Sequence, residues 1–222
     1  MLFAFLALVA FAEDTAPGAD LPAPQTWAGH QVSIATRKVP LLGRIETRQD
    51  VWMVGEVMDG PDGPVVVETA CRIDLKSTAG LELVFAPAAV RKLPKPTIAW
   101  KAAPDGSLAA SWTNGWGHTD IDGNGEPGFE VGVKVAVCSG NLEIASSTRF
   151  VGTATRVDGG IDGRVDLVID REILQASNAC LGLVPKVSKD AVKASFRWRP
   201  VAAGATCESL AAAGWPVTAA PL

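Results

Sequence analysis

The stretch from His118 to Glu130 is where residue types and spacing suggest chemistry rather than packing. Oxygen-bearing side chains occupy alternate positions at Asp120, Asp122 and Asn124, and a glycine follows directly. Ca²⁺ takes such carboxylate and carboxamide oxygens from alternate positions of a loop, and glycine permits the sharp turn that must follow them. The spacing therefore predicts a structural calcium site, with ligands drawn from Asp120, Asp122, Asn124, Glu126 and Glu130.

Residues 120–126 resemble the first half of an EF-hand loop, with Asp120 at loop position 1 and Gly125 at position 6. An EF-hand carries a bidentate glutamate at position 12, where this chain has Val131. The residues after the loop alternate as in a strand, so we expect a calcium loop at a strand entrance rather than a helix–loop–helix. The alternative is a turn whose Asp and Asn side chains bond only to their own backbone.

Catalytic motifs are not evident. The chain has no nucleophile elbow, zinc-protease helix, phosphate loop or dinucleotide fingerprint. With no tyrosine and two histidines, carboxylates would be the main general acids and bases. His118 could pair with Asp120, but we interpret it as a loop histidine. The aspartates of a further cluster are interpreted as a solvated turn and the outer face of a hairpin: Asp158, Asp162 and Asp166.

Seven tryptophans give the chain an unusual supply of large aromatic surface. Trp100, Trp112 and Trp116 are candidates to line a pocket for an apolar or carbohydrate ligand. The alternative is that these rings simply fill a β-sheet core. A Trp-lined cavity of several hundred Å³ would favour a ligand, and a filled interior would favour a structural role.

The elements that must position these residues are predicted to be strands. Alternating apolar segments separated by Gly, Pro, Asp and Asn turns, including one at Ser139–Asn141, indicate about eight to ten strands in hairpin order. We expect a mainly β fold, an antiparallel meander closed into a β-barrel, with a two-sheet sandwich as the alternative. Cys207–Ala213 predicts one short C-terminal helix, and Arg171–Ser177 could form another. By strand count alone, the architecture resembles that of the lipocalins and other calycins.

The N-terminus predicts export. Residues 1–12 are apolar and end in Ala-Phe-Ala, as a signal peptide does, and residues 13–29 form an acidic, Pro-rich linker. Residues 30–222 are then a single β-rich domain. No other apolar run is long enough to span a membrane. We expect a periplasmic or extracellular protein, and the lack of an N-glycosylation sequon agrees with a bacterial source.

Four cysteines in an exported chain predict two disulfides, with three possible pairings. Their spacing matches no zinc motif. We favour Cys180 with Cys207, because they are close in sequence, and Cys71 with Cys138 by elimination.

Composition excludes some classes of function. The chain is 48% hydrophobic and 20% charged, which is incompatible with general disorder. Its net charge is −4 with scattered basic residues, so nucleic acid is not an expected partner. Two hypotheses remain: an exported non-catalytic binding protein with a structural calcium loop, and a structural or surface-interaction module without a small ligand. A hydrolase is a distant third.

Overall fold

The computed structural model describes residues 24–39, 43–135 and 138–220, so the predicted signal peptide lies outside the described residues. Eleven strands dominate these ranges. They are β1 (Gln25–Val39), β2 (Gly43–Gly60), β3 (Gly63–Ser77), β4 (Glu82–Val84), β5 (Thr97–Ala99), β6 (Lys101–Ala102), β7 (Leu108–Trp116), β8 (Phe129–Val135), β9 (Cys138–Val157), β10 (Gly160–Ala176) and β11 (Val187–Pro200). The helices are α1 (Pro87–Val90), α2 (Cys207–Ala212) and a 3-10 turn, η1 (Leu181–Leu183). None of the helices in these ranges is long and apolar enough to cross a membrane.

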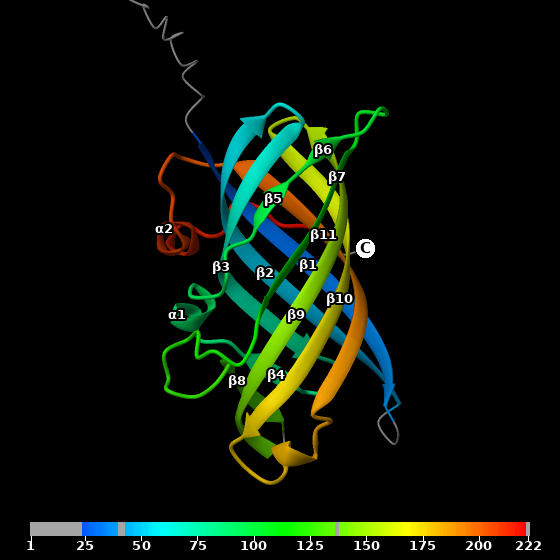
Figure 1. Ribbon diagram of the computed structural model, residues 1–222, viewed down its shortest axis with the longest axis vertical. Helices are drawn as coiled ribbons and strands as arrows, with labels where there is room; N and C mark the ends of the chain where they lie inside the picture. Colours follow the sequence, from blue (N-terminus) through cyan, green and yellow to red (C-terminus); the bar gives the residue numbers. More distant parts are fainter. Residues whose placement is uncertain (1–23, 40–42, 136–137, 221–222) are drawn as a thin grey trace, which may run out of the picture.

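Eight strands form a closed antiparallel ring in the order β10-β11-β1-β2-β3-β4-β8-β9, and β9 pairs with β10 to complete it (Figure 1). This confirms the predicted antiparallel meander and its closure. Closure pairs most of the strand edges of the ring, which is the economical solution for a long meander. The β1 strand begins at Gln25, inside the stretch that the sequence assigned to the linker.

The ring is not an even barrel, because different strands lie between β3 and β9 at its two ends. At one end β4 pairs with residues 74–76 of β3, and β8 pairs with residues 138–144 of β9. Toward the other end β5 pairs with residues 65–67 of β3, and β7 pairs with residues 146–154 of β9. The chain passes between the two levels through α1 and returns through the loop that joins β7 to β8.

Two apolar clusters follow this division. The first draws residues from strands all round the ring, so it fills the interior at the β5–β7 level. The second gathers around β8 and the start of β9, with Val90 of α1 completing it. The indole ring of Trp198 is central to the first cluster. A Cβ added to Gly29 or Gly55 would lie 2.7 or 2.9 Å from that ring, so glycine is required for it to lie flat on β1 and β2.

The C-terminal segment covers the outer face of β1 and β2. The predicted helix is confirmed as α2, whose N-cap Thr206 accepts a hydrogen bond from the backbone of Ser209 in a capping box. Leu210 and Val217 bury against Ala28 of β1. The second predicted helix is wrong: residues 171–176 belong to β10, because pairing with β9 and β11 outweighs their local helix propensity.

The four cysteines form two disulfides, as predicted, but the favoured pairing of Cys180 with Cys207 and Cys71 with Cys138 is wrong. Cys71 bonds to Cys207, with Cα atoms 5.3 Å apart, and Cys138 bonds to Cys180, at 6.3 Å. Cys71 is the extra residue of a β-bulge in β3, where the register with β2 shifts. The pairing therefore depends on which cysteines lie close together in the folded protein, and it does not follow their separation in sequence. Disulfides of this kind persist in oxidising compartments.

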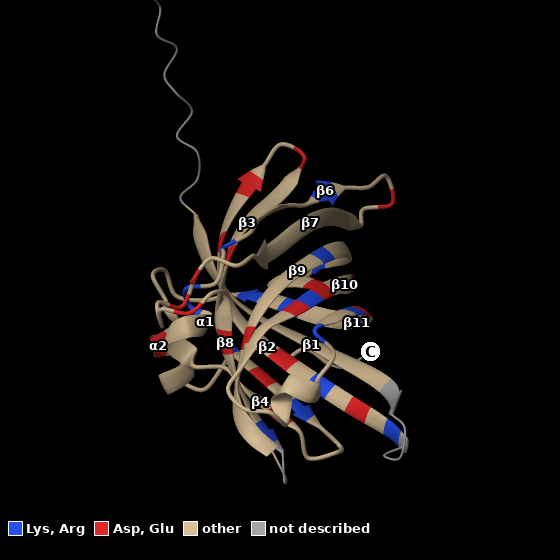
Figure 2. Cartoon of the chain, turned by 60° about the horizontal axis from the view of Figure 1, so that its bottom comes forward, with Lys and Arg blue, Asp and Glu red and all other residues tan. Residues whose placement is uncertain are grey.

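Charged residues of both signs are interspersed along the strands (Figure 2). Several face each other across neighbouring strands, such as Lys189 and Asp170 at 3.2 Å and Arg197 and Asp162 at 3.1 Å. Ion pairs this exposed contribute little to stability, about 0–1 kcal/mol each. Their arrangement keeps either sign from dominating these strands.

Candidate functional site

The candidate calcium loop connects β7 to β8 and lies beside α1 on the outside of the ring (Figure 1). Two backbone hydrogen bonds close its base: Ile121 N–H donates to the carbonyl of Gly128 at 3.1 Å, and Gly128 N–H donates to Thr119 at 3.2 Å. The loop therefore has a fixed entrance and exit. Its side chains are held against the start of β8 and β9.

Asp120 organises the first half of the loop. Its two carboxylate oxygens accept hydrogen bonds from the backbone N–H groups of Gly125 at 2.9 Å and Gly123 at 2.6 Å. These bonds hold the pKa of Asp120 below its usual range. Gly123 and Gly125 have φ values of 76° and 90°, a region in which glycine is favoured. The alternation of acidic residues and glycines thus produces the tight turn that the sequence predicted.

Asp122 and Asn124 connect this turn to the sheet. Asp122 Oδ2 accepts from the backbone N–H of Glu130 at 2.7 Å, at the beginning of β8. Asn124 Oδ1 accepts from the N–H of Glu126 at 2.8 Å, while its Nδ2 donates to Glu143 Oε1 at 3.2 Å. The loop residues predicted from sequence are therefore gathered in one region, together with a glutamate from β9.

Glu143 is the site residue that sequence reasoning missed. It is 7% exposed, it stands directly opposite Glu130 in the β8–β9 register, and its Oε2 has no hydrogen-bond partner. Burial raises the pKa of Glu143, and the nearby charges of Glu130, Asp122 and Glu126 raise it further. A buried carboxylate oxygen without a partner is energetically costly. A cation in this region would relieve both the missing contact and the repulsion.

Sequence reasoning missed Glu143 because it placed the turn between β8 and β9 at the wrong residues. A hairpin centred on Gly140 would pair Glu130 with Phe150, ten residues to either side. In the structure β8 ends at Val135 and β9 begins at Cys138, so the register brings Glu143 opposite Glu130 instead. No local feature of residue 143 distinguishes it from an ordinary strand residue. The signal that could have found it is the β8–β9 register.

The remaining acidic side chains are already partnered. Glu126 accepts from Gln175 Nε2 at 2.7 Å, and Glu130 accepts from Asn141 Nδ2 at 2.9 Å. Lys92, which follows α1, donates from its ammonium group to the backbone carbonyl of Asp122. The loop is thus tied to the segment after α1, to β9 and to β10 by side-chain contacts. It is a defined surface and not a loose connection.

The donor set fits a calcium ion in part. Within the described ranges, no three His, Cys, Asp or Glu side chains converge closely enough to hold a metal ion. The oxygens of Asp120 and Asp122 accept backbone hydrogen bonds, as in the turn interpretation. However, calcium also uses carboxamide and backbone carbonyl oxygens. Asn124 and the unsatisfied oxygen of Glu143 supply donors that suit it.

A groove of about 570 Å³ lies between α1 and the outer face of β4, β8 and β9. Three of the predicted calcium ligands line it: Asp122, Asn124 and Glu130. An ion held by them would face the groove and would not be enclosed by protein. The groove falls within the 300–1,000 Å³ that is typical of small-ligand sites.

The three tryptophans proposed for a ligand pocket lie apart. Trp100 and Trp112 belong to the first cluster, with ring centroids 6.0 Å apart, and Trp100 is only 4% exposed. Trp116 belongs to the second cluster, where its Nε1 donates to the carbonyl of Ile144 at 2.8 Å. The free space beside Trp100 and Trp112 is about 10 Å³, room for about one water. Glu68 borders this space, and burial raises its pKa to about 7.

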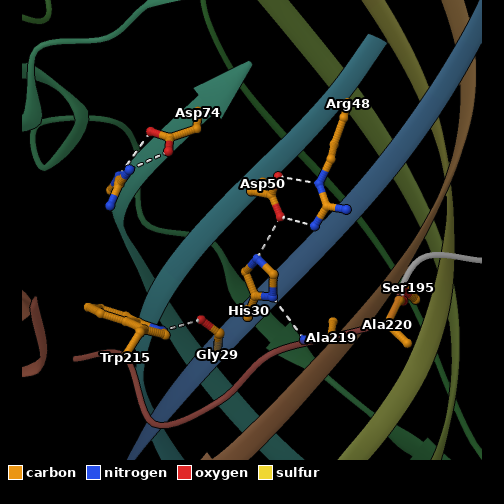
Figure 3. Close-up of polar contacts among 10 residues, drawn as sticks. Gly29, His30, Arg48, Asp50, Asp74, Ser195, Trp215, Ala219 and Ala220 are labelled. Carbon is orange, nitrogen blue, oxygen red and sulfur yellow. Dashed lines mark hydrogen bonds and ion pairs between the residues drawn. The ribbon is translucent and has the colours of Figure 1, made fainter. Parts of the chain in front are cut away.

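His30 forms a second polar cluster, on the outer face of β1 (Figure 3). Its Nε2 lies 3.0 Å from Asp50 Oδ1, and its Nδ1 accepts from the backbone N–H of Ala219 at 2.8 Å. Arg48 donates two hydrogen bonds of 2.7 Å to Asp50. The ring is 1% exposed, and burial lowers its pKa despite the opposing effect of Asp50. Because both ring nitrogens are engaged under the C-terminal segment, this cluster secures that segment to β1.

His118 remains exposed at the edge of the loop. Its Nε2 lies 3.1 Å from Glu172 Oε2 of β10, so its partner is this glutamate and not Asp120. The His118–Asp120 pair that the spacing allowed is therefore not formed. Exposed pairs of this kind contribute little to stability.

Comparisons of the chain with protein-family models, with curated proteins and with solved structures found no match. The feature that favours a bound ligand is the buried Oε2 of Glu143, which has no hydrogen-bond partner and lies beside the Asp122–Asn124 loop.

Proposed function

We propose that this protein is an exported, non-catalytic binding protein whose β7–β8 loop holds a structural calcium ion. The observation that carries the proposal is the unpartnered Oε2 of Glu143, nine-tenths buried beside Asn124 and opposite Glu130. The two disulfides support an oxidising, exported compartment.

Calcium suits this donor set because it accepts six to eight oxygens in flexible geometry. Asp122, Asn124, Glu130 and Glu143 would supply side-chain oxygens, and the loop would add backbone carbonyls. The same negative charges that raise the pKa of Glu143 would attract a dication. Since the bidentate position-12 glutamate is replaced by Val131, we expect weak affinity, with a Kd on the order of 10⁻⁴–10⁻³ M as in extracellular modules.

The ion would act on stability and not as a signal. The loop enters a strand of a closed ring, so binding has no mobile helix to move. At calcium concentrations of one to ten times Kd, linkage adds roughly 0.4–1.4 kcal/mol to the free energy of unfolding. A shift of this size raises the melting temperature by only a few degrees in a domain of this length.

The alternative, a structural or surface-interaction module without a small ligand, is favoured by a different observation. The space beside Trp100 and Trp112 in the ring interior has a volume of only about 10 Å³. That interior therefore favours packing over ligand storage.

Calorimetric titration of the disulfide-bonded protein with calcium chloride tests the proposal. We expect one weak site, a smaller response to magnesium because of its stricter octahedral geometry, and a rise in melting temperature with calcium. Glu143→Gln keeps the size of the side chain but removes its charge, and it should weaken binding at least tenfold.

The matched control is Asp105→Asn. Asp105 also accepts hydrogen bonds within a turn, from the backbone and hydroxyl of Ser107, but that turn lies between β6 and β7. This variant should bind calcium as the wild type does. No binding heat, together with equal melting temperatures in calcium and in chelator, would show that the loop is only a turn.

A further inference from the structure

The two hairpin turns that join β2 to β3 and β9 to β10 lie together at one end of the ring, at the top in Figure 1. A pocket of about 180 Å³ lies at this end. Its lining comes from β1, β2, β3, β9 and β10, so the pocket is the mouth of the ring. Ligand sites are common in the mouths of β-barrels, and a volume below the 300–1,000 Å³ of drug-sized sites suits a small molecule.

The pocket has an apolar floor and a polar rim. Trp27, Val57 and Ile161 form the floor, and all three belong to the apolar cluster that fills the interior below. Side chains two residues apart on a strand share a face of the sheet. Gln25 and Asp59 therefore also face into the ring, one step nearer its end than Trp27 and Val57. A ligand at the mouth would meet apolar groups below it and polar groups around it.

An ion pair crosses the rim. Arg156 of β9 places its Nη2 atom 3.6 Å from Oδ1 of Asp59 on β2, and these two strands are not neighbours in the ring. That separation is too long for a hydrogen bond. Neither side chain makes a hydrogen bond with another residue that the structure describes, and both are more than half exposed. The donors of Arg156 and the acceptors of Asp59 are therefore available to a ligand.

Charges around the mouth favour a ligand that carries both signs. The lining holds one cation and one anion, Arg156 and Asp59. Beyond the lining, the two hairpin turns add Asp62 and Asp158, and β6, which is hydrogen-bonded to the first turn, adds Lys101. These groups give no positive excess that would attract a simple anion, and Arg156 would repel a simple cation. A zwitterion can satisfy both members of the pair through charge-assisted hydrogen bonds.

We propose that the mouth of the ring binds a free α-amino acid with a small aliphatic side chain. The α-carboxylate would accept from Arg156, the α-ammonium group would donate to Asp59, and the side chain would lie on the floor beside Trp27. The pocket shares no lining residue with the groove beside the calcium loop. The inference therefore gives the proposed binding protein a class of ligand and does not depend on the calcium ion.

The probes are L-leucine, L-valine and L-alanine, titrated by calorimetry into the disulfide-bonded protein in chelator. We expect saturable binding, with leucine and valine tighter than alanine because they bury more apolar surface. Two analogues of leucine each lack one charge: isopentylamine lacks the carboxylate, and isocaproate lacks the ammonium group. Each should bind about tenfold or more weakly than leucine, because one charged group at the rim is left without its partner.

Variants of the ion pair should change the preference among these compounds as well as the affinity. Arg156→Gln should weaken leucine binding about tenfold or more and leave leucine and isopentylamine with similar affinities, because the carboxylate has lost its partner. Asp59→Asn should do the same for leucine and isocaproate. Exposed ion pairs contribute little to stability, so both variants should melt as the wild type does. The matched controls are Arg149→Gln on β9 and Asp62→Asn in the β2–β3 turn, which lie outside the lining and should leave leucine binding unchanged.

Several outcomes would overturn the proposal. Absence of saturable binding of all three amino acids would do so. Equal binding of leucine and either analogue by the wild type, or equal losses in Arg156→Gln and Arg149→Gln, would also refute it. Saturable binding of D-glucose without binding of leucine would assign the mouth to a carbohydrate and refute the amino-acid site. Calcium binding is measured separately in the metal-only titration, so the two proposals succeed or fail independently.

Discussion

Removing the Cys71–Cys207 disulfide should be the most destabilising single cross-link loss in this protein. The bond joins residues 136 apart in sequence, whereas Cys138 and Cys180 are 42 apart. The chain-entropy relation gives about 5 kcal/mol for the first loop and about 4 kcal/mol for the second. The difference of about 1 kcal/mol arises because the longer loop removes more freedom from the unfolded chain.

The perturbation is the double variant Cys71→Ala and Cys207→Ala. Alanine is preferred to serine because both positions are buried and a hydroxyl there would lack a partner. The comparison variant is Cys138→Ala with Cys180→Ala. Urea unfolding followed by circular dichroism measures both, and non-reducing peptide mapping of the wild type first verifies the pairing.

We expect the first variant to lose more stability than the second, and to loosen the C-terminal segment that the bond anchors to β3. Burial of Leu210 and Val217 should keep the segment partly docked. A peptide map that joins Cys180 to Cys207 would refute the pairing. A loss below about 1 kcal/mol for the first variant, or a larger loss for the second, would refute the loop-length reasoning.

Two further predictions concern the outer face of β1 and the ring interior. Burial lowers the pKa of His30, so the folded protein binds its proton less readily than the unfolded chain does. The stability from neutral His30 is fully present above about pH 6.5 and is lost as the pH falls through the lowered folded value. Urea midpoints should fall over this range in the wild type more than in His30→Gln, and parallel curves would contradict the assignment. Gly29→Ala places a Cβ 2.7 Å from the Trp198 ring and should cost roughly 1–3 kcal/mol in a thermal or urea melt. Gly182→Ala, with open space around it, is the control, and equal effects of the two variants would argue against the packing of Trp198 on β1.

The fold was largely predictable because its signals are local. Alternation of apolar and polar residues marked the strands, and Gly, Pro and Asp turns marked most of their ends. Closure followed from the need to protect edges. The C-terminal helix was predictable because Thr206 caps it and Gly214 follows it, and both act within a few residues.

Features that depend on pairing between distant strands were not predictable. The cysteine pairs depended on which strands became neighbours and on a bulge at Cys71. The expected helix over residues 171–177 does not form, because residues 171–176 belong to β10, which pairs with β9 and β11. In the candidate site, the loop turn at Asp120 was visible in the sequence. Glu143 was not, because its role depends on the β8–β9 register.

The pairing of β1 with β11 has a consequence for how the protein is made. Trp27 and Pro200 are register partners although 173 residues separate them (200 − 27 = 173). Such long-range pairing is slow, because chain entropy is lost before the contacts form. In a chain synthesised N-terminus first, β11 (residues 187–200) is made last of the strands, and until then β1 and β10 each present an unpaired edge that can pair with another chain. Shielding of these two edges until β11 has formed is therefore one condition for folding without aggregation.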